Sequence, residues 1–315
     1  MTATFAAPQF RFSGHETFPC RYTWLPKAVT HIGENPRLFS DEDGAMVTLG
    51  VGKNMVRAIK FWAEVTGVAQ PNHKDGWSVT EFGQNLFGHE GYDLYLEDIR
   101  TLWLIHWKIS SRVRDPLFAW HFLLNRWHRS EFSRSEVFRS LRDEADRMGK
   151  KVSNVTLEHH FTTFLHTYVP TKGQKREVLE DNLDCPLVEL ELIQKTGERT
   201  LRETSRHEAV YAFRMEEKPE ISPQLFAFCV HDFWTQRRAN EKTLTLRDIS
   251  VAEGSVGQIF KLPERDIRER LEHLKSGSAG AFEFRESAAL QQIVRLEEVS
   301  QSELLDSVYG ARTMI

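Results

Sequence analysis

The chain has 315 residues, of which 40% are apolar and 27% charged, and its formal net charge is −4. These values are typical of globular proteins and exclude a disordered chain, a collagen and a coiled coil. The length is about twice the ~150 residues of a typical domain, so we expect two or three domains. No segment approaches the ~18 consecutive apolar residues of a membrane helix, no secretory signal is recognisable, and the three cysteines show no CxxC spacing, which together predict a cytoplasmic protein.

The charge is unevenly distributed along the chain. Residues 100–151 contain 12 Lys and Arg against 6 Asp and Glu, a local charge of +6, so the remainder must carry −10. Half of the eight tryptophans lie in the same segment. A basic and aromatic segment is typical of nucleic-acid binding, although four tryptophans more often form a core.

The secondary-structure elements of residues 10–92 can be predicted in order. We predict a helix at 21–30, a short helix at 43–49, a tight turn at Gly50–Gly52 and a strong helix at 53–66. Two short strands around the polar turn PNHKDG and a helix at 81–87 follow. Helix, turn, helix and hairpin is the order of a winged helix-turn-helix unit, although many such units contact only protein.

The helix at 53–66 has one apolar face at helical spacing and one basic face. Recognition helices contact bases or phosphates near their N-terminal ends, where this helix carries lysine and asparagine. The glycine-rich string LGVGKN before it lacks the GxxxxGK[ST] spacing of a phosphate loop. We therefore predict that the basic face contacts double-stranded DNA through Lys53, Asn54, Arg57 and Lys60.

Residues 93–172 are predicted to be helical. Helices at 96–109 and 115–127 are apolar nearly all round, and the corner between them is predicted to expose Arg112 and Arg114. Together with Arg126 and Arg129, these arginines form a second predicted phosphate-binding band. A further helix pair is expected at 133–149 and 152–169.

The remainder of the chain again predicts helix, turn, helix and wing, at 255–296. The second helix here, residues 264–275, carries four acidic and four basic residues. Because these charges balance, the helix should gain little binding free energy from contact with phosphates. We interpret this unit as structural or partner-binding. The expected fold class is mainly α with small β-wings, in domains spanning 1–92, 93–172 and 173–315, and the three similar units hint at a repeat without a fixed period.

Two stretches combine residues that could carry catalysis. His15 and Glu16 lie in SGHETFPC, where a histidine and a carboxylate could serve as base and orienter or bind a hard metal; the alternative is a loop fixed onto the first helix. Asp181 and Asp184 lie in an acidic stretch that could equally be a solvated loop. Glu158, His159 and His160 follow one another on a helix, about 100° apart, and cannot converge on one ion.

Several strings resemble one bacterial protein family: FSGHETFPCRYTWLPKAV (12–29), VTLGVGKNMVRAIKFWAEVTGV (47–68), YLEDIRTLWLIHWKI (95–109) and EDNLDCPLVEL (180–190). This family, long classified as a domain of unknown function encoded in phage-defence islands, includes SspB, the DNA-nicking subunit of single-stranded DNA phosphorothioation systems. The resemblance implies a protein that binds and nicks duplex DNA so that partner proteins can insert sulfur. Those partners would be a cysteine desulfurase, a PAPS-reductase-like protein and an ATPase.

The leading hypothesis is thus a DNA-binding, strand-nicking endonuclease of a phosphorothioation and anti-phage defence system. Its catalytic residues would come from His15, Glu16, Asp181 and Asp184, with Mg²⁺ or Mn²⁺ as cofactor and no nucleotide or organic cofactor. The alternatives are a non-catalytic DNA-recognition adaptor that recruits the sulfur-transfer enzymes and a transcriptional regulator of the defence island. The oligomeric state stays open, with a homodimer as one alternative because DNA modifiers often read near-palindromic sites by symmetry.

Overall fold

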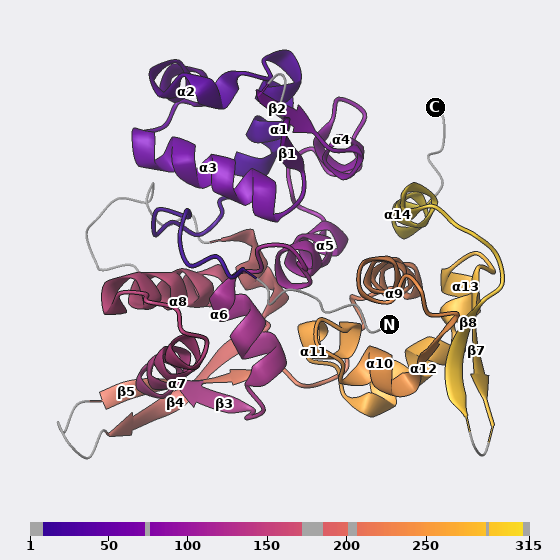
Figure 1. Ribbon diagram of the computed structural model, residues 1–315. Coiled ribbons are helices and arrows are strands. Elements are labelled where there is room, and N and C mark those ends of the chain that lie inside the picture. Colours follow the sequence, from indigo (N-terminus) through magenta and orange to yellow (C-terminus); the bar gives the residue numbers. More distant parts are fainter. Residues whose placement is uncertain (1–8, 73–75, 172–184, 201–206, 288–289, 311–315) are drawn as a thin grey trace.

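The computed structural model of the protein describes residues 9–72, 76–171, 185–200, 207–287 and 290–310. Within these ranges the fold is mainly α-helical with small antiparallel sheets, as predicted (Figure 1). No helix in the described part of the chain is long and apolar enough to cross a membrane.

The N-terminal unit contains four helices and a β-hairpin, and it lies at the top of Figure 1. Its elements are α1 (Trp24–Glu34), α2 (Glu42–Leu49), α3 (Lys53–Val65), β1 (Ala69–Asn72), β2 (Gly76–Val79) and α4 (Glu81–Phe87). The Asp41 side chain caps α2 by accepting from the backbone N–H groups of Asp43 and Gly44. Gly50 ends α2 in the left-handed conformation, at φ +66°. These local signals place the turn before α3 where the sequence predicts it.

The middle unit combines helices with a three-stranded sheet. Its elements are α6 (Phe118–His121), η2 (Phe122–Arg126), β3 (Glu131–Ser133), α7 (Arg134–Arg147), α8 (Asn154–Tyr168), η3 (Pro186–Leu190), β4 (Ile193–Thr200) and β5 (His207–Phe213). The strand order is β3-β5-β4. Because β4 and β5 complete a sheet begun at Glu131, this unit continues past the predicted domain boundary at residue 172. Pairing between strands so distant in sequence leaves no local signal in the chain.

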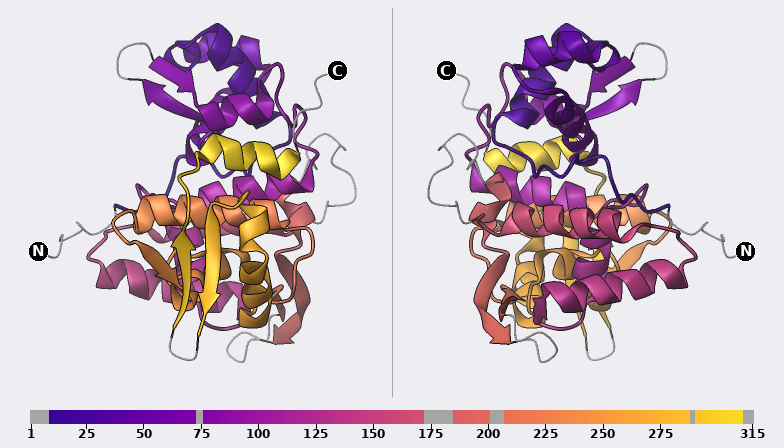
Figure 2. Two further views of the ribbon diagram at one scale, coloured as in Figure 1. Left: turned by 90° about the vertical axis from the view of Figure 1, so that its right-hand side faces the viewer. Right: turned by 90° about the vertical axis from the view of Figure 1, so that its left-hand side faces the viewer.

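The C-terminal unit is built in the same way, and its sheet has the order β6-β8-β7. Its elements are α9 (Pro223–Arg237), β6 (Thr243–Thr245), α10 (Leu246–Ser250), α11 (Val256–Phe260), α12 (Glu264–Glu272), α13 (Leu274–Gly277), β7 (Phe282–Glu286), β8 (Gln291–Arg295) and α14 (Gln301–Tyr309). Helix α14 returns to the N-terminal unit, beneath which Figure 2 shows it lying. There Tyr309 stacks on Tyr92, with ring centroids 4.5 Å apart.

All three units share a general order: a helix, a segment that bonds to the hairpin, further helices and the hairpin itself. Two α-helices precede the hairpin in the N-terminal and middle units, whereas four short helices, α10 to α13, precede it in the C-terminal unit. In the middle and C-terminal units that segment is a strand, β3 or β6, paired with the last strand of the hairpin. In the N-terminal unit the backbone N–H of Trp77 on β2 donates to the carbonyl of Pro36 at 2.9 Å. The segment ahead of α2 thus occupies the place that β3 and β6 take in the other two units.

The tryptophans of the basic segment form core rather than surface. Helix α5 (Ile99–Ser110) runs through the centre of the molecule and carries Trp103 and Trp107, both fully buried. Trp120 on α6 is also fully buried, and Trp127 is 7% exposed. The aromatic residues therefore do not offer a stacking surface for nucleic-acid bases.

Residues 115–127 do not form the single helix that the sequence predicts. Asp115 is left-handed, at φ +46°, so α6 begins only at Phe118, and after His121 the chain continues as the π-helical turn η2. The ammonium of Lys261 donates to the carbonyl of Leu124 in this turn at 2.7 Å. A residue 137 positions away thus satisfies a carbonyl at the end of the helix, a contact that local periodicity cannot reveal.

Candidate nucleic-acid interface

Helix α3 presents the predicted DNA-contacting residues to solvent. Val56, Ile59 and Trp62 are buried on its inner face. The N-cap is Gly52, which supplies no side-chain hydrogen bond to the first turn. An uncapped helix N-terminus flanked by cations favours a bound anion. The exposed residues of the outer face are Lys53, Asn54, Arg57 and Lys60.

A carboxylate from the neighbouring helix already bridges two of these cations. Glu42, at the start of α2, accepts from Nε of Arg57 at 2.7 Å and from its Nη2 at 3.3 Å. The ammonium of Lys53 lies 2.8 Å from Oε2 of the same carboxylate. The hydrogen bonds from Arg57 and then Lys53 lower the pKa of Glu42 to about 2, so it is ionised at neutral pH.

The remaining cation of the stripe contacts the hairpin. The ammonium of Lys60 lies over the ring of Trp77 on β2, 5.5 Å from its centroid, an arrangement that attracts the cation to the face of the ring. This contact links the end of the basic stripe to the hairpin beside α3.

The GHET segment forms a strained turn. The backbone N–H of Phe18 donates to the carbonyl of His15 at 2.8 Å, and the two residues between them are left-handed, with φ +48° at Glu16 and +66° at Thr17. Such turns normally use asparagine and glycine, and a β-branched residue there is an outlier that costs on the order of 1–3 kcal/mol. Strain of this kind persists only where the surroundings impose it.

The surroundings that impose it are a buried pair of histidines. His15 is 3% exposed and His160 on α8 is fully buried, and Nε2 of His15 lies 3.1 Å from Nδ1 of His160. The backbone N–H of Ala119 donates to Nε2 of His160 at 3.1 Å, so the ring is held from α6 as well as from the GHET turn.

Further contacts hold the His15 ring in place. The backbone N–H of Thr17 donates to Nδ1 of His15 at 3.1 Å, so a hydrogen bond from within the turn fixes the ring. Oγ1 of Thr163 on α8 also lies 3.1 Å from this nitrogen, and it donates to the carbonyl of His159 at 3.0 Å.

Both rings are therefore held neutral. Burial lowers the pKa of His15 to about 4, helped by the nearby His159 and Arg11, and burial lowers that of His160 well below its ordinary value. A buried neutral histidine cannot reach a strand bound at the surface. The structure thus gives His15 the role of fixing the turn, onto α8 rather than onto the first helix.

Glu16 lies beside the basic stripe rather than in the core. It is half-buried, and its charge helps to raise the pKa of Arg57, whose main partner is Glu42. The structure thus brings Glu16 and the basic face of α3 together, while His15 points inward. Asp181 and Asp184, the other predicted catalytic residues, lie outside the described residues.

The second predicted band of arginines does not form one surface. Arg112 turns inward, where its guanidinium donates to the carbonyls of Glu64 at 3.1 Å and Val65 at 3.2 Å at the end of α3, and burial lowers its pKa. The expectation that the corner exposes Arg112 is therefore wrong; it exposes Arg114. Arg126 is exposed but lies 2.8 Å from Glu253.

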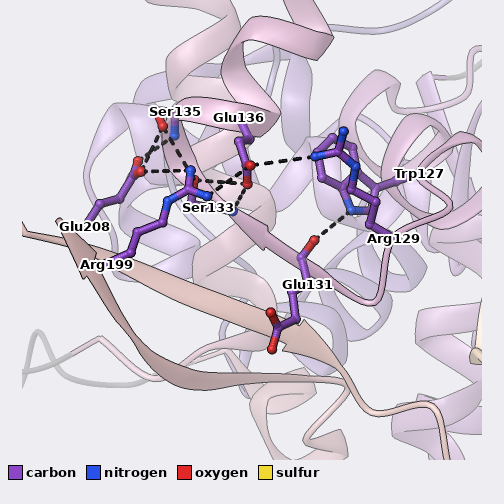
Figure 3. A network of polar contacts seen from close by, with 8 residues as sticks. All are labelled: Trp127, Arg129, Glu131, Ser133, Ser135, Glu136, Arg199 and Glu208. Atoms are coloured by element: carbon purple, nitrogen blue, oxygen red, sulfur yellow. Dashed lines mark hydrogen bonds and ion pairs between the residues drawn. The ribbon is translucent and has the colours of Figure 1, made fainter. Parts of the chain in front are cut away.

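Arg129, the last member of the band, borders a polar network on the middle unit (Figure 3). At its centre, Nη1 of Arg199 on β4 lies 3.0 Å from Glu136, and Nη2 lies 3.5 Å from Glu208. Glu208 accepts from the backbone N–H of Ser135 at 2.6 Å, in the first turn of α7. Two guanidinium groups, those of Arg199 and Arg129, offset the two carboxylates, so the network fastens the sheet to α7.

No group of three or more His, Cys, Asp or Glu side chains suited to a metal ion occurs in the described ranges. Asp181 and Asp184, the predicted carboxylates that could complete a metal site with Glu16, lie outside these ranges. On α8, His160 is buried in the core and the adjacent His159 is exposed, so the two imidazoles do not face the same site.

Two residues of this region escaped the sequence interpretation. For His160 the sequence analysis excludes a shared metal site and assigns no other role, although a histidine on the apolar face of a helix at 152–169 signals a buried polar contact. Glu42 was not considered, although its position one residue after a capping aspartate places it at the start of a helix, facing the next one. The partners of both residues lie on other elements, so neither contact could be inferred from spacing.

Comparisons with known proteins agree on one family. Residues 12–309 match the family described as a protein of unknown function, DUF4007. The magnesium ion-bound crystal structure of SspB is similar with a TM-score of 0.80 and 25% sequence identity, covering 94% of this chain and 87% of that one. A second SspB crystal structure, with a TM-score of 0.76 over the same shares and 22% identity, is similar in fold. No protein with a curated description matches the chain.

Proposed function

The chain belongs to the DUF4007 family, which includes SspB, and from this membership we propose that it is a DNA-binding, strand-nicking component of a bacterial DNA phosphorothioation and anti-phage defence system. The observation that carries the proposal is the similarity to the magnesium ion-bound SspB structure over 94% of the chain. The motif resemblance described above supplies the expected reaction. Its partners would be a cysteine desulfurase, a PAPS-reductase-like protein and an ATPase.

Each of the three repeated units is, in this proposal, a winged-helix unit. The shared order of helices and the matching strand orders β3-β5-β4 and β6-β8-β7 support it. In such units the second helix of the pair is the one that enters a DNA groove. The corresponding helices are α3, α8 and α12, of which α3 carries the unbalanced cations.

DNA contact is assigned to the exposed face of α3. Its four residues lie on one side of a helix whose other side is core. Arg114 is the exposed member of the second band that is proposed to add phosphate contacts outside α3, since Arg126 pairs with Glu253 and Arg129 lies 3.6 Å from Glu136. Arg112 is left to its structural contact with the end of α3.

The nicking centre is proposed to include the carboxylate of Glu16. It lies in a strained turn next to the basic stripe, and strained backbone clusters at active sites. Asp181 and Asp184 stay candidates for the same centre. Mg²⁺ or Mn²⁺ is the proposed cofactor, and His15 is proposed to act through the turn that it fixes.

The test is conversion of supercoiled plasmid to open circles by the purified full-length chain with Mg²⁺ or Mn²⁺, and again after addition of a chelator. Glu16→Gln is compared with Glu34→Gln, a control that removes an exposed carboxylate from α1. DNA binding is measured for every protein. Metal-dependent nicking that disappears in Glu16→Gln alone, while binding persists, supports the proposal.

Other results of the nicking assay would change the proposed active site or the proposed function. Nicking that survives Glu16→Gln shifts the centre to Asp181 and Asp184, which are then replaced by Asn. Binding without nicking by any of these proteins favours the second candidate function, a DNA-recognition adaptor that recruits the sulfur-transfer enzymes. The observation that favours the adaptor is that the described residues assemble no metal-ligand set.

A further inference from the structure

The contact between α2 and α3 has the features of an occupied anion site. Two cations from successive positions on the outer face of α3, Lys53 and Arg57, converge on the single carboxylate of Glu42. All three side chains are open to solvent, with exposed fractions of 53%, 44% and 34% respectively. The carboxylate therefore lies on the surface assigned to DNA and is not part of the core.

The donors around this carboxylate are those that bind phosphate. Arg57 contacts it through Nε and Nη2, in the forked arrangement that suits carboxylate and phosphate oxygens equally. The ammonium of Lys53 approaches Oε2, which also accepts from Nη2. The first turn of α3, which has no side-chain cap, lies next to this point.

We propose that Lys53 and Arg57 form a phosphate-binding site of α3, that Glu42 fills it in the free protein, and that a DNA phosphodiester displaces Glu42. This inference rests on the proposed DNA-binding function. Its ligand is a phosphate diester of the duplex backbone. Since a phosphate carries the same unit charge as the carboxylate, the exchange leaves the two cations satisfied and releases Glu42 to solvent.

The exchange makes Glu42 a competitor of DNA. While it is in place, one of the charges that α3 offers to the duplex is cancelled. Glu64, the one acidic residue of α3 itself, is paired with Arg11 at 2.8 Å and is not available for the same role. Removal of the Glu42 charge should therefore tighten DNA binding. If the carboxylate merely held Arg57 in position, its removal should instead weaken DNA binding, because the guanidinium would lose its fixed orientation.

The test measures the dissociation constant of the full chain for a short DNA duplex over a range of salt concentrations. The variants are Glu42→Gln, Asp43→Asn and Arg57→Gln. Asp43 is the matched control, because it is exposed in the same first turn of α2, so both variants lose similar interactions with that helix. Thermal unfolding of each variant checks that the fold is retained.

We expect Glu42→Gln to bind about three- to tenfold more tightly than the unmodified chain at low salt, with the gain shrinking as added salt screens the charges. Asp43→Asn should change the dissociation constant by less than about twofold. In the Arg57→Gln background, Glu42→Gln should have little further effect, because the arginine of the site is gone.

Unchanged or weaker binding by Glu42→Gln, with binding still sensitive to Arg57→Gln, would overturn the phosphate site while leaving α3 as the DNA-contacting helix. An equal gain from Asp43→Asn would overturn it too, since the effect would then be one of net charge. Binding that is insensitive to both Arg57→Gln and Lys60→Gln would overturn the assignment of DNA to α3 and this inference with it.

Discussion

The N-terminal and C-terminal units place their charges in opposite locations. In the N-terminal unit the buried His15 is neutral and contacts the neutral His160 of the middle unit, while the surface of α3 carries three cations against the one carboxylate of Glu42. The C-terminal unit buries charged groups and balances its surface. A surplus of charge at the surface is available to a polyanion, whereas charge that is buried or paired serves the fold.

Two buried lysines illustrate the C-terminal arrangement. Lys218 is fully buried and donates to the carbonyls of Arg214 at 2.7 Å and Glu216 at 3.0 Å. Lys261 is 6% exposed. Burial lowers the pKa of Lys218 to about 8 and that of Lys261 to about 7, because carbonyl groups only partly replace the water that a charged ammonium loses.

The surface of the C-terminal unit shows the balance directly. On α12, Arg270 lies 2.9 Å from Asp266 and Arg265 lies 3.5 Å from Glu269, while Arg268 pairs with Glu286 on β7. Each cation of the helix thus has an anionic partner, as the equal count of acidic and basic residues predicts. Helix α3, which corresponds to α12 in the N-terminal unit, has more exposed cations than anionic partners for them. For this reason α3 alone is assigned to DNA.

The largest expected effect tests this contrast by charge reversal. Arg57→Glu with Lys60→Glu should weaken DNA binding at least about 100-fold at low salt, because two phosphate contacts become repulsive. Arg265→Glu with Arg268→Glu, the same change on α12, should weaken it by less than about threefold. Fluorescence anisotropy with labelled duplex measures both. Equal losses would show that the balanced helix contacts DNA as well.

The second prediction concerns the buried neutral pair of His15 and His160. His160→Ala should lower the free energy of unfolding by about 3 kcal/mol, because it opens a cavity and leaves the N–H of Ala119 and a nitrogen of His15 without partners. His159→Ala, the adjacent and exposed position, should change it by less than about 0.5 kcal/mol. Urea unfolding measures both, and similar losses would contradict the histidine pair as an anchor.

The histidines and lysines should respond to pH in different windows. The folded-state pKa of His15, about 4, lies below its unfolded value of 6.5, so its contribution is present above pH 6.5 and is lost as the pH falls toward 4. Between pH 6.5 and 5 the loss from this residue should be about 1–2 kcal/mol.

The measurement is the free energy of unfolding of the unmodified chain and of His15→Gln across that window. The variant should show a shallower decline, since it lacks one group that gains a proton on unfolding. An identical slope in the two proteins would mean that His15 is not held neutral. The C-terminal lysines contribute at higher pH: their lowered pKa values predict stability that increases from about pH 7 toward 10.5.

The smallest expected effect concerns the strained turn. Thr17→Gly should raise the free energy of unfolding by up to about 1 kcal/mol, because glycine adopts φ +66° without strain. Ala279→Gly, at φ +51° in the C-terminal unit, provides the comparison. If Thr17→Gly gains stability but nicks DNA more slowly, the strain serves the site, whereas unchanged nicking would make it incidental.

Much of the N-terminal unit could be predicted because its signals are local. The apolar period of residues 53–66, the cap at Asp41 and the glycines at 50 and 52 act within one or two helical turns, and α2, α3 and α4 lie where these signals place them. The exposure of the basic face follows from the same period, since burying Val56 and Ile59 turns Arg57 and Lys60 outward.

The candidate site was only half predictable for the opposite reason. Sequence spacing identified the GHET segment as unusual, but the partner of His15 is 145 residues away, on a different helix. The inward turn of Arg112 depends on where α3 ends in space, and the extent of the middle unit depends on β5 pairing with β3. Packing decides all three.

By itself, the sequence determined the family, the mainly α class and the amphipathic helix with its surplus of cations. Only the tertiary structure decided that His15 is a buried neutral anchor, that Glu42 covers two of those cations, and that three units share one topology. The physical reason is range. Helical periodicity, caps and turn residues are satisfied within a few residues, whereas hydrogen bonds and ion pairs between elements form only once hydrophobic packing has brought distant segments together.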